Sequence, residues 1–492
     1  MRGRALALSL AVLVTLVACK GQTEATPAAP APLTNDAATV TSAAPAQNSY
    51  ADAVARVSPA VVTVRSERRA RAAQQFPFFD DPRFREFFGD RLPRGQQPEA
   101  PRRAEGLGSG VIVSADGYIL TNHHVVDGAE EITVELTDNR TFRAKLIGSD
   151  PPSDLAVLKI EQQGLPVLPL GDSDRVRVGD VALAVGNPLG IGQTVTMGII
   201  SAKGRATGLS DGSFEDFIQT DAPINRGNSG GALVNAGGEL IGINSQILSP
   251  TGGNIGIGFA IPANMAKNVL DQLVKSGKVR RGYLGIGPQD VTADIAQSIG
   301  LRDVRGVIVR NVQPGSAAER AGLRRGDVIT SLNGQPVLDS NSFRNRIAGT
   351  QPGGEVTLTV TRDGREQQLR ATLAELPAEA NAREREGGGQ TPNNAQPSGR
   401  LGVTVEPLTP EQARQFELPA NTQGLVVTAV DPEGPAADAG LRQGDVIEEA
   451  NRQPVRSTED LRAAIERSGT RPVLLLVNRR GNSVFITVTP RR

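Results

Sequence analysis

The second half of the chain contains an internal repeat, and this repeat limits the possible folds most strongly. Gly306 to Val337 matches Gly424 to Val455 at a constant offset of 118 residues. Each copy carries Ala-Gly-Leu-Arg and then Gly-Asp-Val-Ile, starting at Ala321 in the first copy and at Ala439 in the second. The sequence therefore predicts two copies of one domain.

The repeat divides the chain of 492 residues into parts. At about 150 residues per domain, a chain of this length is expected to hold roughly three domains. We place the repeated domains at 280–376 and 399–490, and a larger domain at 49–276. The segment 377–398 is charged and rich in Gly and Asn, which is typical of a flexible linker.

The N-terminus has the pattern of an export signal. Arg2 and Arg4 are followed by an uncharged apolar run from Ala5 to Val17, which is too short to span a bilayer comfortably. Small residues before Cys19 resemble a bacterial lipobox, which implies cleavage before Cys19 and a lipid on its sulfur. The alternative is a plain cleaved signal with an incidental Cys. In either case we expect residues 1–19 to be a signal peptide.

Two further N-terminal segments have a biased composition. Residues 20–48 are rich in Ala, Pro and Thr without apolar periodicity, which indicates a disordered tether. Residues 75–90 hold six of the thirteen Phe residues of the chain, interleaved with charges. This aromatic cluster is either an apolar patch under a loop or a contact surface for another subunit.

Composition excludes several classes of function. Lys and Arg together number 53, as do Asp and Glu, so there is no basic surplus for general nucleic-acid binding. One Cys and two His do not supply the usual ligand spacings of a metal site. A Walker-type phosphate loop is also missing. We therefore expect neither a metal nor another cofactor.

The larger domain is expected to be mainly β. From Gly106 to Ile261, short β-branched runs alternate with Gly, Asp, Asn and Pro, which is typical of an all-β sandwich or barrel. Residues 264–275 then have apolar positions at helical spacing, and Gly277 follows as a stop signal.

Ser229 is the candidate nucleophile because of the glycines around it. It lies in Gly-Asn-Ser-Gly-Gly at 227–231. Glycine accepts backbone angles that other residues avoid, so a tight turn here could aim the N–H groups of Gly227 and Ser229 at one point. By itself, the run fits an ordinary turn equally well.

Acyl transfer also needs a base and a group that orients it. The chain offers only His123 and His124, between apolar runs that predict the end of a strand. Asp154 stands just before the apolar run Leu155 to Leu158, and a partly buried Asp there could hold a His tautomer. Alone, Asp154 would be a turn residue, but the order His, Asp, Ser is that of chymotrypsin-type enzymes.

These motifs together resemble the HtrA (Deg) family of periplasmic serine proteases. The motifs are Thr-Asn-x-His-Val-Val at 121–126, Ser-Asp-Leu-Ala-Val-Leu at 153–158 and the run at 227–231, followed by the repeats. The resemblance implies a chymotrypsin-like double β-barrel followed by two PDZ domains. It selects His124 as the base, with Asp154 and Ser229 completing the triad and an oxyanion hole at Gly227, Asn228 and Ser229.

The resemblance also suggests a specificity pocket. The sixth residue before the nucleophile is Pro223, so no acid is available there to select Lys or Arg. We expect cleavage after small or medium aliphatic residues, and loops at 203–214 and 244–253 that serve regulation and the pocket. The expected substrate-binding residues are Ile224, Asn225, Arg226, Ile243, Asn244 and Ile247.

Each repeat begins with a motif that resembles the carboxylate-binding loop of PDZ domains, where a peptide C-terminus adds as a strand. The loop residues are Tyr283, Leu284, Gly285 and Ile286 in the first copy, and Leu401, Gly402 and Val403 in the second. Peptide binding is favoured for the first copy. The second copy could equally serve assembly.

The favoured function is an ATP-independent serine endopeptidase of the bacterial envelope that degrades misfolded proteins. The alternatives are a chaperone-like scaffold with little proteolysis and a PDZ adaptor. The family implies trimers or multiples of trimers, with unfolded chains and peptide C-termini as partners. It implies a periplasmic location, and Lys20 after Cys19 weakly favours the outer membrane over the inner one as the site of a lipid anchor. It also implies that the loop around Gly227 can adopt an inactive form.

Overall fold

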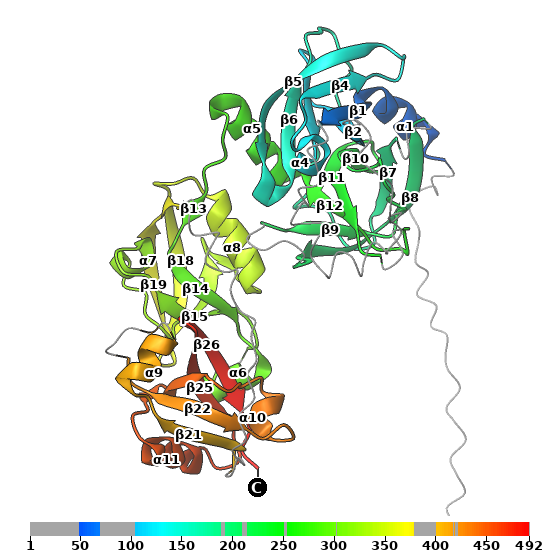
Figure 1. The fold of residues 1–492 in the computed structure, drawn as a ribbon. Coiled ribbons are helices and arrows are strands. Elements are labelled where there is room, and N and C mark those ends of the chain that lie inside the picture. The colour runs from blue at the N-terminus through cyan, green and yellow to red at the C-terminus, as the bar shows by residue number, and fades with distance from the viewer. Residues whose placement is uncertain are drawn as a thin grey trace, which may run out of the picture. The chain divides into compact units, whose positions relative to one another are not determined.

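The structure is a computed structural model, and it has a mainly β architecture (Figure 1). The residues that it describes are 49–68, 104–187, 192–208, 214–249, 253–301, 303–377, 400–416, 418 and 422–491. The expected signal peptide at 1–19, the tether at 20–48, Cys19 and the aromatic cluster lie outside these residues. So does nearly all of the expected linker.

The first half of the large domain is a closed barrel with the strand order β1-β2-β3-β6-β5-β4. Every neighbouring pair is antiparallel, and β1 closes the barrel by pairing with β4. A short helix, α1 (Ala51–Val57), and a 3₁₀ turn, η1 (Ser58–Ala60), lead into the first strand. The strands are β1 (Val61–Arg68), β2 (Ala104–Ile112), β3 (Tyr118–Thr121), β4 (Glu131–Glu135), β5 (Thr141–Asp150) and β6 (Leu155–Lys159).

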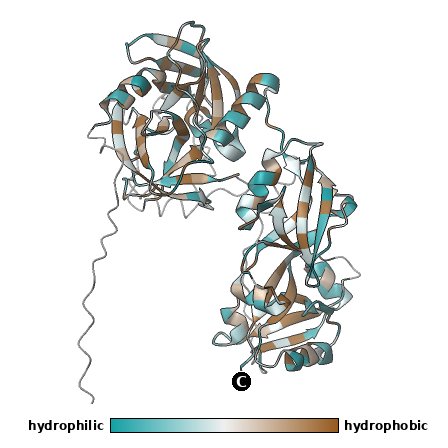
Figure 2. Cartoon of the chain, turned by 180° about the vertical axis from the view of Figure 1, so that it is seen from behind, coloured by the Kyte–Doolittle hydropathy of each residue, from teal (hydrophilic) through white to brown (hydrophobic). Residues whose placement is uncertain are grey.

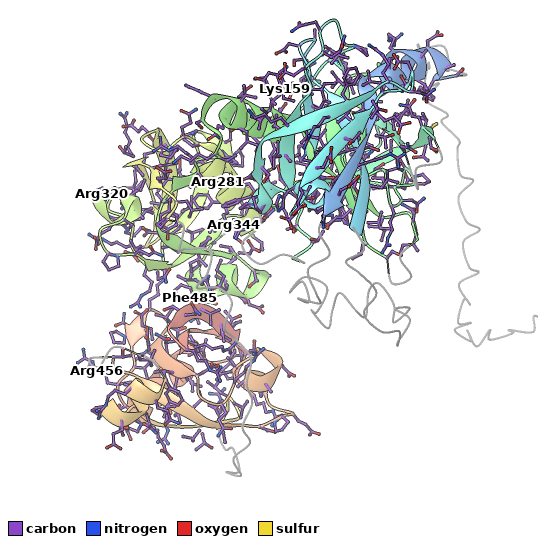
Figure 3. The ribbon with its side chains drawn as sticks, turned by 45° about the horizontal axis from the view of Figure 1, so that its top comes forward. Lys159, Arg281, Arg320, Arg344, Arg456 and Phe485 are labelled. Carbon is purple, nitrogen blue, oxygen red and sulfur yellow. The ribbon has the colours of Figure 1, made fainter. Side chains whose placement is uncertain are left out.

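The register of β3 against β6 brings two sequence motifs to one end of this barrel. Thr121, the last residue of β3, pairs with Ala156 near the start of β6. The residues after β3 and those before β6 are therefore neighbours. Lys159, labelled in Figure 3, lies at the other end of the pair. Its Nζ is 5.3 Å from the ring centroid of Tyr118.

A second closed barrel follows, with the order β10-β11-β12-β9-β8-β7. Its antiparallel closure is the pairing of β10 with β7. The strands are β7 (Val181–Gly186), β8 (Thr194–Arg205), β9 (Phe217–Thr220), β10 (Ala232–Asn235), β11 (Leu240–Ile247) and β12 (Gly258–Pro262). The predicted β-rich fold is thus confirmed as two barrels of six strands.

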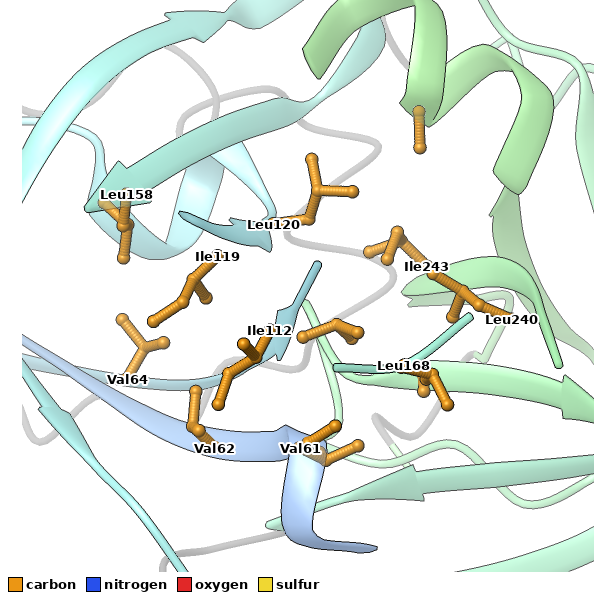
Figure 4. Close-up of a cluster of buried hydrophobic side chains, with 14 of the residues drawn as sticks. Val61, Val62, Val64, Ile112, Ile119, Leu120, Leu158, Leu168, Leu240 and Ile243 are labelled. Atoms are coloured by element: carbon orange, nitrogen blue, oxygen red, sulfur yellow. The ribbon is translucent and has the colours of Figure 1, made fainter. Parts of the chain in front are cut away.

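One apolar cluster contains side chains from both barrels, including Val62 and Ile119 of the first and Leu240 and Ile243 of the second (Figure 4). Burial of such aliphatic side chains contributes about 1.5–3 kcal/mol each, so a shared cluster is a strong restraint between the barrels. Helix α5 (Ala263–Ser276) adds Val269 and Leu273 to this cluster and ends at Gly277, whose φ is 71°. The helix predicted at 264–275 is confirmed.

The two repeats fold alike, as their sequences predict. The first has the sheet order β14-β15-β16-β18-β19 and the second has β21-β22-β23-β25-β26, each with a short strand paired to its third member. Each sheet buries its own aliphatic cluster. The hydropathy colouring shows the apolar residues on the strands of both repeats (Figure 2).

The elements of the first repeat are β13 (Gly282–Tyr283), β14 (Ile286–Asp290), α6 (Ala293–Ile299), β15 (Val307–Val312), α7 (Ala317–Arg320), β16 (Val328–Leu332), β17 (Gln335–Pro336), α8 (Ser340–Gly349), β18 (Glu355–Arg362), β19 (Arg365–Thr372) and β20 (Ala374–Glu375). Those of the second are β21 (Val403–Pro407), α9 (Pro410–Gln415), β22 (Leu425–Val430), α10 (Pro435–Asp438), β23 (Val446–Ala450), β24 (Gln453–Pro454), α11 (Thr458–Ser468), β25 (Val473–Arg479) and β26 (Asn482–Val488).

Candidate active site

The structure brings His124 and Asp154 into direct contact. His124 lies on a single helical turn, α4 (His123–Val126), just after β3, and Asp154 follows the 3₁₀ turn η2 (Pro151–Ser153) just before β6. The Nδ1 of His124 is 2.9 Å from Oδ2 of Asp154 and 3.0 Å from Oδ1. The backbone N–H of His124 also donates to Oδ1 at 3.0 Å. Asp154 thus fixes both the ring and the backbone of His124.

The backbone of Asp154 is shaped for these contacts. Its φ of 54° is in the left-handed region, which Asp tolerates better than most residues. Its carbonyl accepts the N–H of His123 at 3.1 Å and the side-chain amide of Asn122 at 2.9 Å. The two loops that follow β3 and precede β6 are therefore joined through one residue.

His123 does not share this arrangement. Its Nε2 lies 3.7 Å from Oδ1 of Asp127, on the same helical turn. Its Nδ1 is buried and has no hydrogen-bond partner within the described part of the chain. Of the two neighbouring His residues, only His124 contacts Asp154 through its ring.

The charge state of the pair follows from two opposing effects. Desolvation lowers the pKa of His124, but the negative charge of Asp154 and its hydrogen bond outweigh desolvation, so the pKa is raised above 6.5. For Asp154, desolvation raises the pKa, and the His124 charge and the hydrogen bonds to the carboxylate lower it by more. Asp154 is therefore a carboxylate that stabilises the imidazolium form of His124.

Ser245, on β11, is a residue that the sequence analysis missed. Its hydroxyl donates to Oδ2 of Asp154 at 3.0 Å, and its carbonyl accepts the hydroxyl of Ser229 at 2.9 Å. Ser245 thus lies between the carboxylate and the candidate nucleophile. It is 91 residues from Asp154 along the chain, and no local sequence pattern marks it.

Ser229 lies in a tight turn between β9 and β10. The N–H of Asn228 donates to the backbone carbonyl of Asn225 at 3.0 Å, and the N–H of Gly231 donates to the backbone carbonyl of Asn228 at 2.9 Å. Gly227 has a φ of 96° and Gly230 a φ of 83°, which only glycine adopts readily. A Cβ at Gly230 would also come within 2.1 Å of the Ser109 carbonyl oxygen. The glycines of the motif are therefore required by geometry.

Two backbone donors in this turn are unused. Within the described residues, neither the N–H of Gly227 nor that of Ser229 donates to a protein acceptor. Free N–H groups on either side of a turn are what an oxyanion hole supplies. Asn228 lies between them with only 2% of its surface exposed, and its Oδ1 is buried without a described partner.

The six residues expected to bind substrate fall into three pairs that differ in burial and packing. Ile224 and Ile247 belong to one apolar cluster in the second barrel, while Asn225 and Arg226 are exposed. Ile243 and Asn244 have no exposed surface. Ile243 packs in the shared barrel core, and the amide of Asn244 donates to the carbonyl of Ala232 at 3.0 Å.

Asn254, which the sequence analysis did not single out, ties the loop beside these residues to the nucleophile turn. Its side-chain amide donates to the carbonyl of Ile224 at 3.1 Å, and its backbone N–H donates to Oδ1 of Asn225 at 3.3 Å. The signal that could have found it is weak, because Asn is common in loops.

The expected carboxylate-binding loops have the same backbone arrangement in both repeats. The carbonyls of Leu284 and Gly285 accept N–H groups of Ala318 and Gln313 at 2.8 and 2.9 Å. In the second repeat, the carbonyls of Leu401 and Gly402 accept N–H groups at 3.1 and 2.9 Å. In a trans peptide, N–H and C=O point in opposite directions, so the next N–H groups point away from these contacts.

Comparison with known proteins agrees with this arrangement. A trypsin-like peptidase domain matches residues 108–243, and PDZ domains match residues 282–373 and 426–479. A probable periplasmic serine protease do/HhoA-like of Haemophilus influenzae is 43% identical, covering 91% of this chain and 93% of its own length. The periplasmic pH-dependent serine endoprotease DegQ of Escherichia coli is 44% identical, covering 85% and 86% respectively.

The chain belongs to the HtrA/DegP family of periplasmic serine proteases. It is a serine endopeptidase of the bacterial envelope, with a protease domain and two PDZ domains. Among solved structures, the HtrA-type protease AlgW with a decapeptide is 49% identical, with a TM-score of 0.52, and covers 67% of this chain and 99% of that one. The HtrA-type protease AlgW with a tripeptide is 44% identical, with a TM-score of 0.54, and covers 67% of this chain and 98% of that one.

Two features are absent from the residues that the structure describes. No helix among them is long and apolar enough to cross a membrane. No group of three or more His, Cys, Asp or Glu among them could hold a metal ion.

Proposed function

We propose that Ser229 is the nucleophile of this endopeptidase, with His124 as its general base and Asp154 as the residue that orients the base. The contact between the Asp154 carboxylate and Nδ1 of His124 carries the proposal. A hydrogen at Nδ1, held by a carboxylate, leaves Nε2 as the acceptor for the Ser229 proton. The raised pKa of His124 fits a base whose protonated form is stabilised.

These proposed roles give the following reaction. Ser229 Oγ attacks the carbonyl carbon of the scissile peptide bond while His124 takes its proton, and the carbonyl oxygen becomes an oxyanion. The N–H groups of Gly227 and Ser229 bind that oxyanion. His124 returns the proton to the leaving amine, and water then hydrolyses the acyl-enzyme by the same steps.

In the free enzyme, the hydroxyl of Ser229 donates its single proton to the carbonyl of Ser245. Attack requires this proton to turn to His124 instead. This fits the expectation that the loop needs a bound peptide or partner before it is competent.

We infer that the substrates are unfolded or misfolded polypeptides cleaved after small or medium aliphatic residues. Ile224 and the partly buried Ile247 are apolar and belong to one cluster, and Pro223 offers no charge to pair with Lys or Arg. The relatives named periplasmic endoproteases, and the AlgW structures with bound peptides, support a polypeptide substrate.

The PDZ domains are proposed to bind peptide C-termini, through Tyr283 to Ile286 in the first and Leu401 to Val403 in the second. The outward N–H groups of these loops are the donors that a carboxylate needs. The second domain could instead serve assembly into trimers or larger cages. From the sequence alone, we also propose a lipid anchor at Cys19 and its location in the outer membrane.

The test is cleavage of unfolded casein by the wild type and by Ser229→Ala, with peptide bonds located by mass spectrometry. We expect cleavage after aliphatic residues by the wild type and none by the variant. Equal cleavage by both proteins would refute the proposal. Binding of unfolded casein by a wild type that does not cleave it would favour the chaperone-like scaffold instead.

A further inference from the structure

We propose that Ser109 is a positioning residue for the oxyanion hole and that its buried hydroxyl holds Gly227 in the productive orientation. This inference rests on the proposed roles of Gly227 and Ser229. Ser109 lies on β2, in the other barrel from the nucleophile turn, and has no exposed surface.

The hydroxyl of Ser109 is both a hydrogen-bond donor and an acceptor. It donates to the carbonyl of Gly227 at 2.6 Å and accepts the backbone N–H of Asn187 at 2.9 Å. An amide N–H can only donate, so the one hydroxyl proton is left for the Gly227 carbonyl. The direction of this hydrogen bond is therefore fixed by chemistry.

The main chain of Ser109 adds two more contacts to the same region. Its N–H donates to the carbonyl of Ser229 at 2.8 Å, and its carbonyl accepts the hydroxyl of Thr121 at 2.7 Å. Ser109 thus holds the carbonyls of both residues whose N–H groups form the proposed hole. Through Thr121 it also joins them to the strand that leads to His124.

The hydroxyl matters because Gly227 is a glycine. The N–H of Gly227 belongs to the peptide before it, and its carbonyl belongs to the peptide after it. With the second peptide plane fixed, the direction of the N–H depends only on the φ and ψ of Gly227, and its φ is 96°. Glycine rotates at low cost, so a loosened carbonyl would let the N–H turn away from the hole.

The surroundings offer no second restraint of this kind. Within the described residues, Ser109 provides the one hydrogen bond to the Gly227 carbonyl. The space around the Ser109 hydroxyl is closely packed. A Cβ added at Gly186 would come within 2.8 Å of Asn228 Oδ1 and 3.0 Å of Ser109 Oγ. Loss of the hydroxyl would leave a buried carbonyl without its partner, which a protein avoids by rearranging.

The experiment compares Ser109→Ala with the wild type, using a peptide substrate and a matched pair of inhibitors. A peptidyl boronic acid forms a tetrahedral adduct with Ser229 and places an oxygen in the hole. The same peptide ending in a carboxamide fills the same subsites, but it offers the hole only an uncharged, planar carbonyl oxygen and forms no tetrahedral adduct. Ser173→Ala is the control, because Ser173 is 1% exposed and its hydroxyl accepts the N–H of Asn264 at 3.1 Å.

We expect Ser109→Ala to lower kcat by about 10- to 100-fold with KM unchanged, which is less than the loss of a direct oxyanion donor. The boronic acid should lose affinity by a similar factor, while the carboxamide binds as before. Ser173→Ala should leave kcat and both affinities within about twofold of the wild type. A merely structural role for Ser109 predicts no such split between the two inhibitors.

Ser109→Cys keeps a weak donor of similar size and serves if Ser109→Ala does not fold. It should show the same split with a smaller loss. Unchanged boronic acid affinity in the variant that folds, or equal losses for both inhibitors, would overturn the proposal. A wild type that the boronic acid does not inhibit would refute the proposed nucleophile itself, which is a distinguishable result.

Discussion

The protease domain and the PDZ domains each hold a partly or fully buried Asp, and they use it differently. In the first PDZ domain, Asp327 is 2% exposed and accepts Nε and Nη2 of Arg362, both at 2.7 Å. Asp445 and Arg479 repeat this pair in the second domain with the same two distances. Asp154 instead pairs with His124, a side chain that can lose its charge.

The difference teaches how to tell a structural carboxylate from a chemical one. The bidentate Arg pair is permanently charged, and the pKa of Arg362 is raised further by its hydrogen bond to Asp327. The partner of Asp154 is a His side chain, which can lose its charge, and it is about half exposed, with 49% of its side-chain surface accessible. Burial alone would have favoured Asp327 and Asp445 as functional residues, whereas their pairing with Arg favours a structural role.

The strongest test of this contrast is Asp154→Asn. We expect kcat to fall by about 10⁴-fold, because the amide no longer favours the tautomer with hydrogen at Nδ1. The melting temperature should change little in comparison. The sign of the pH effect also follows: without the carboxylate charge, the pKa of His124 falls, so the acid limb of kcat/KM moves to lower pH. An acid limb that stays in place would contradict the assignment.

Asp327→Asn should have the opposite profile. It leaves the charge of Arg362 without its partner, which is expected to destabilise the first PDZ domain by about 3 kcal/mol. Calorimetry of the full chain should show that domain unfolding earlier, while boronic acid binding at Ser229 is retained. Asp445→Asn is the matched control and should shift the other PDZ transition. Loss of boronic acid binding in either variant would contradict a purely structural role for that Asp.

Ser245→Ala tests whether the third donor to Asp154 matters. A hydrogen bond to a charged group is worth about 1.5–3 kcal/mol, so kcat is expected to fall by about 10- to 100-fold. Ser245→Thr keeps the hydroxyl and should retain most of the activity. If both variants behave alike, the hydroxyl is not what positions the carboxylate.

The smallest expected effect separates the two PDZ loops. A Cβ at Gly285 would come within 2.3 Å of Ser316 Cβ, whereas one at Gly402 would stay 3.2 Å from its nearest neighbours. Both glycines have a positive φ, so Ala is strained at either position. Because of its additional clash, Gly285→Ala should weaken binding of a C-terminal peptide to the first domain by about tenfold. Gly402→Ala should do less, as measured by fluorescence anisotropy with a labelled peptide. A larger loss for Gly402→Ala would reverse this ranking.

Local patterns predicted local structure well. The helix at 264–275 followed from its apolar spacing and from Gly277, and the repeat followed from matching residues. The closed barrels follow from pairings between distant strands, which no window of sequence contains. For the same reason Ser109 was missed: its partner Gly227 is 118 residues away.

The substrate residues show a second limit. Ile243 and Asn244 lie on β11, whose first six residues are all buried, so alternation along the strand does not reveal which face meets a ligand. The contact of His124 with Asp154 was expected only through family resemblance. The residues alone do not distinguish His124 from His123. The contact between the His124 ring and Asp154 does.

The most direct test of the account is labelling of the full chain with a fluorophosphonate, followed by location of the adduct by mass spectrometry. We expect one adduct, on Ser229, whose formation is greatly slowed in His124→Ala. We also expect Asp327→Asn to be labelled at the wild-type rate. An adduct on another serine, or equal labelling of the wild type and His124→Ala, would contradict the assignment of Ser229 as a nucleophile activated by His124.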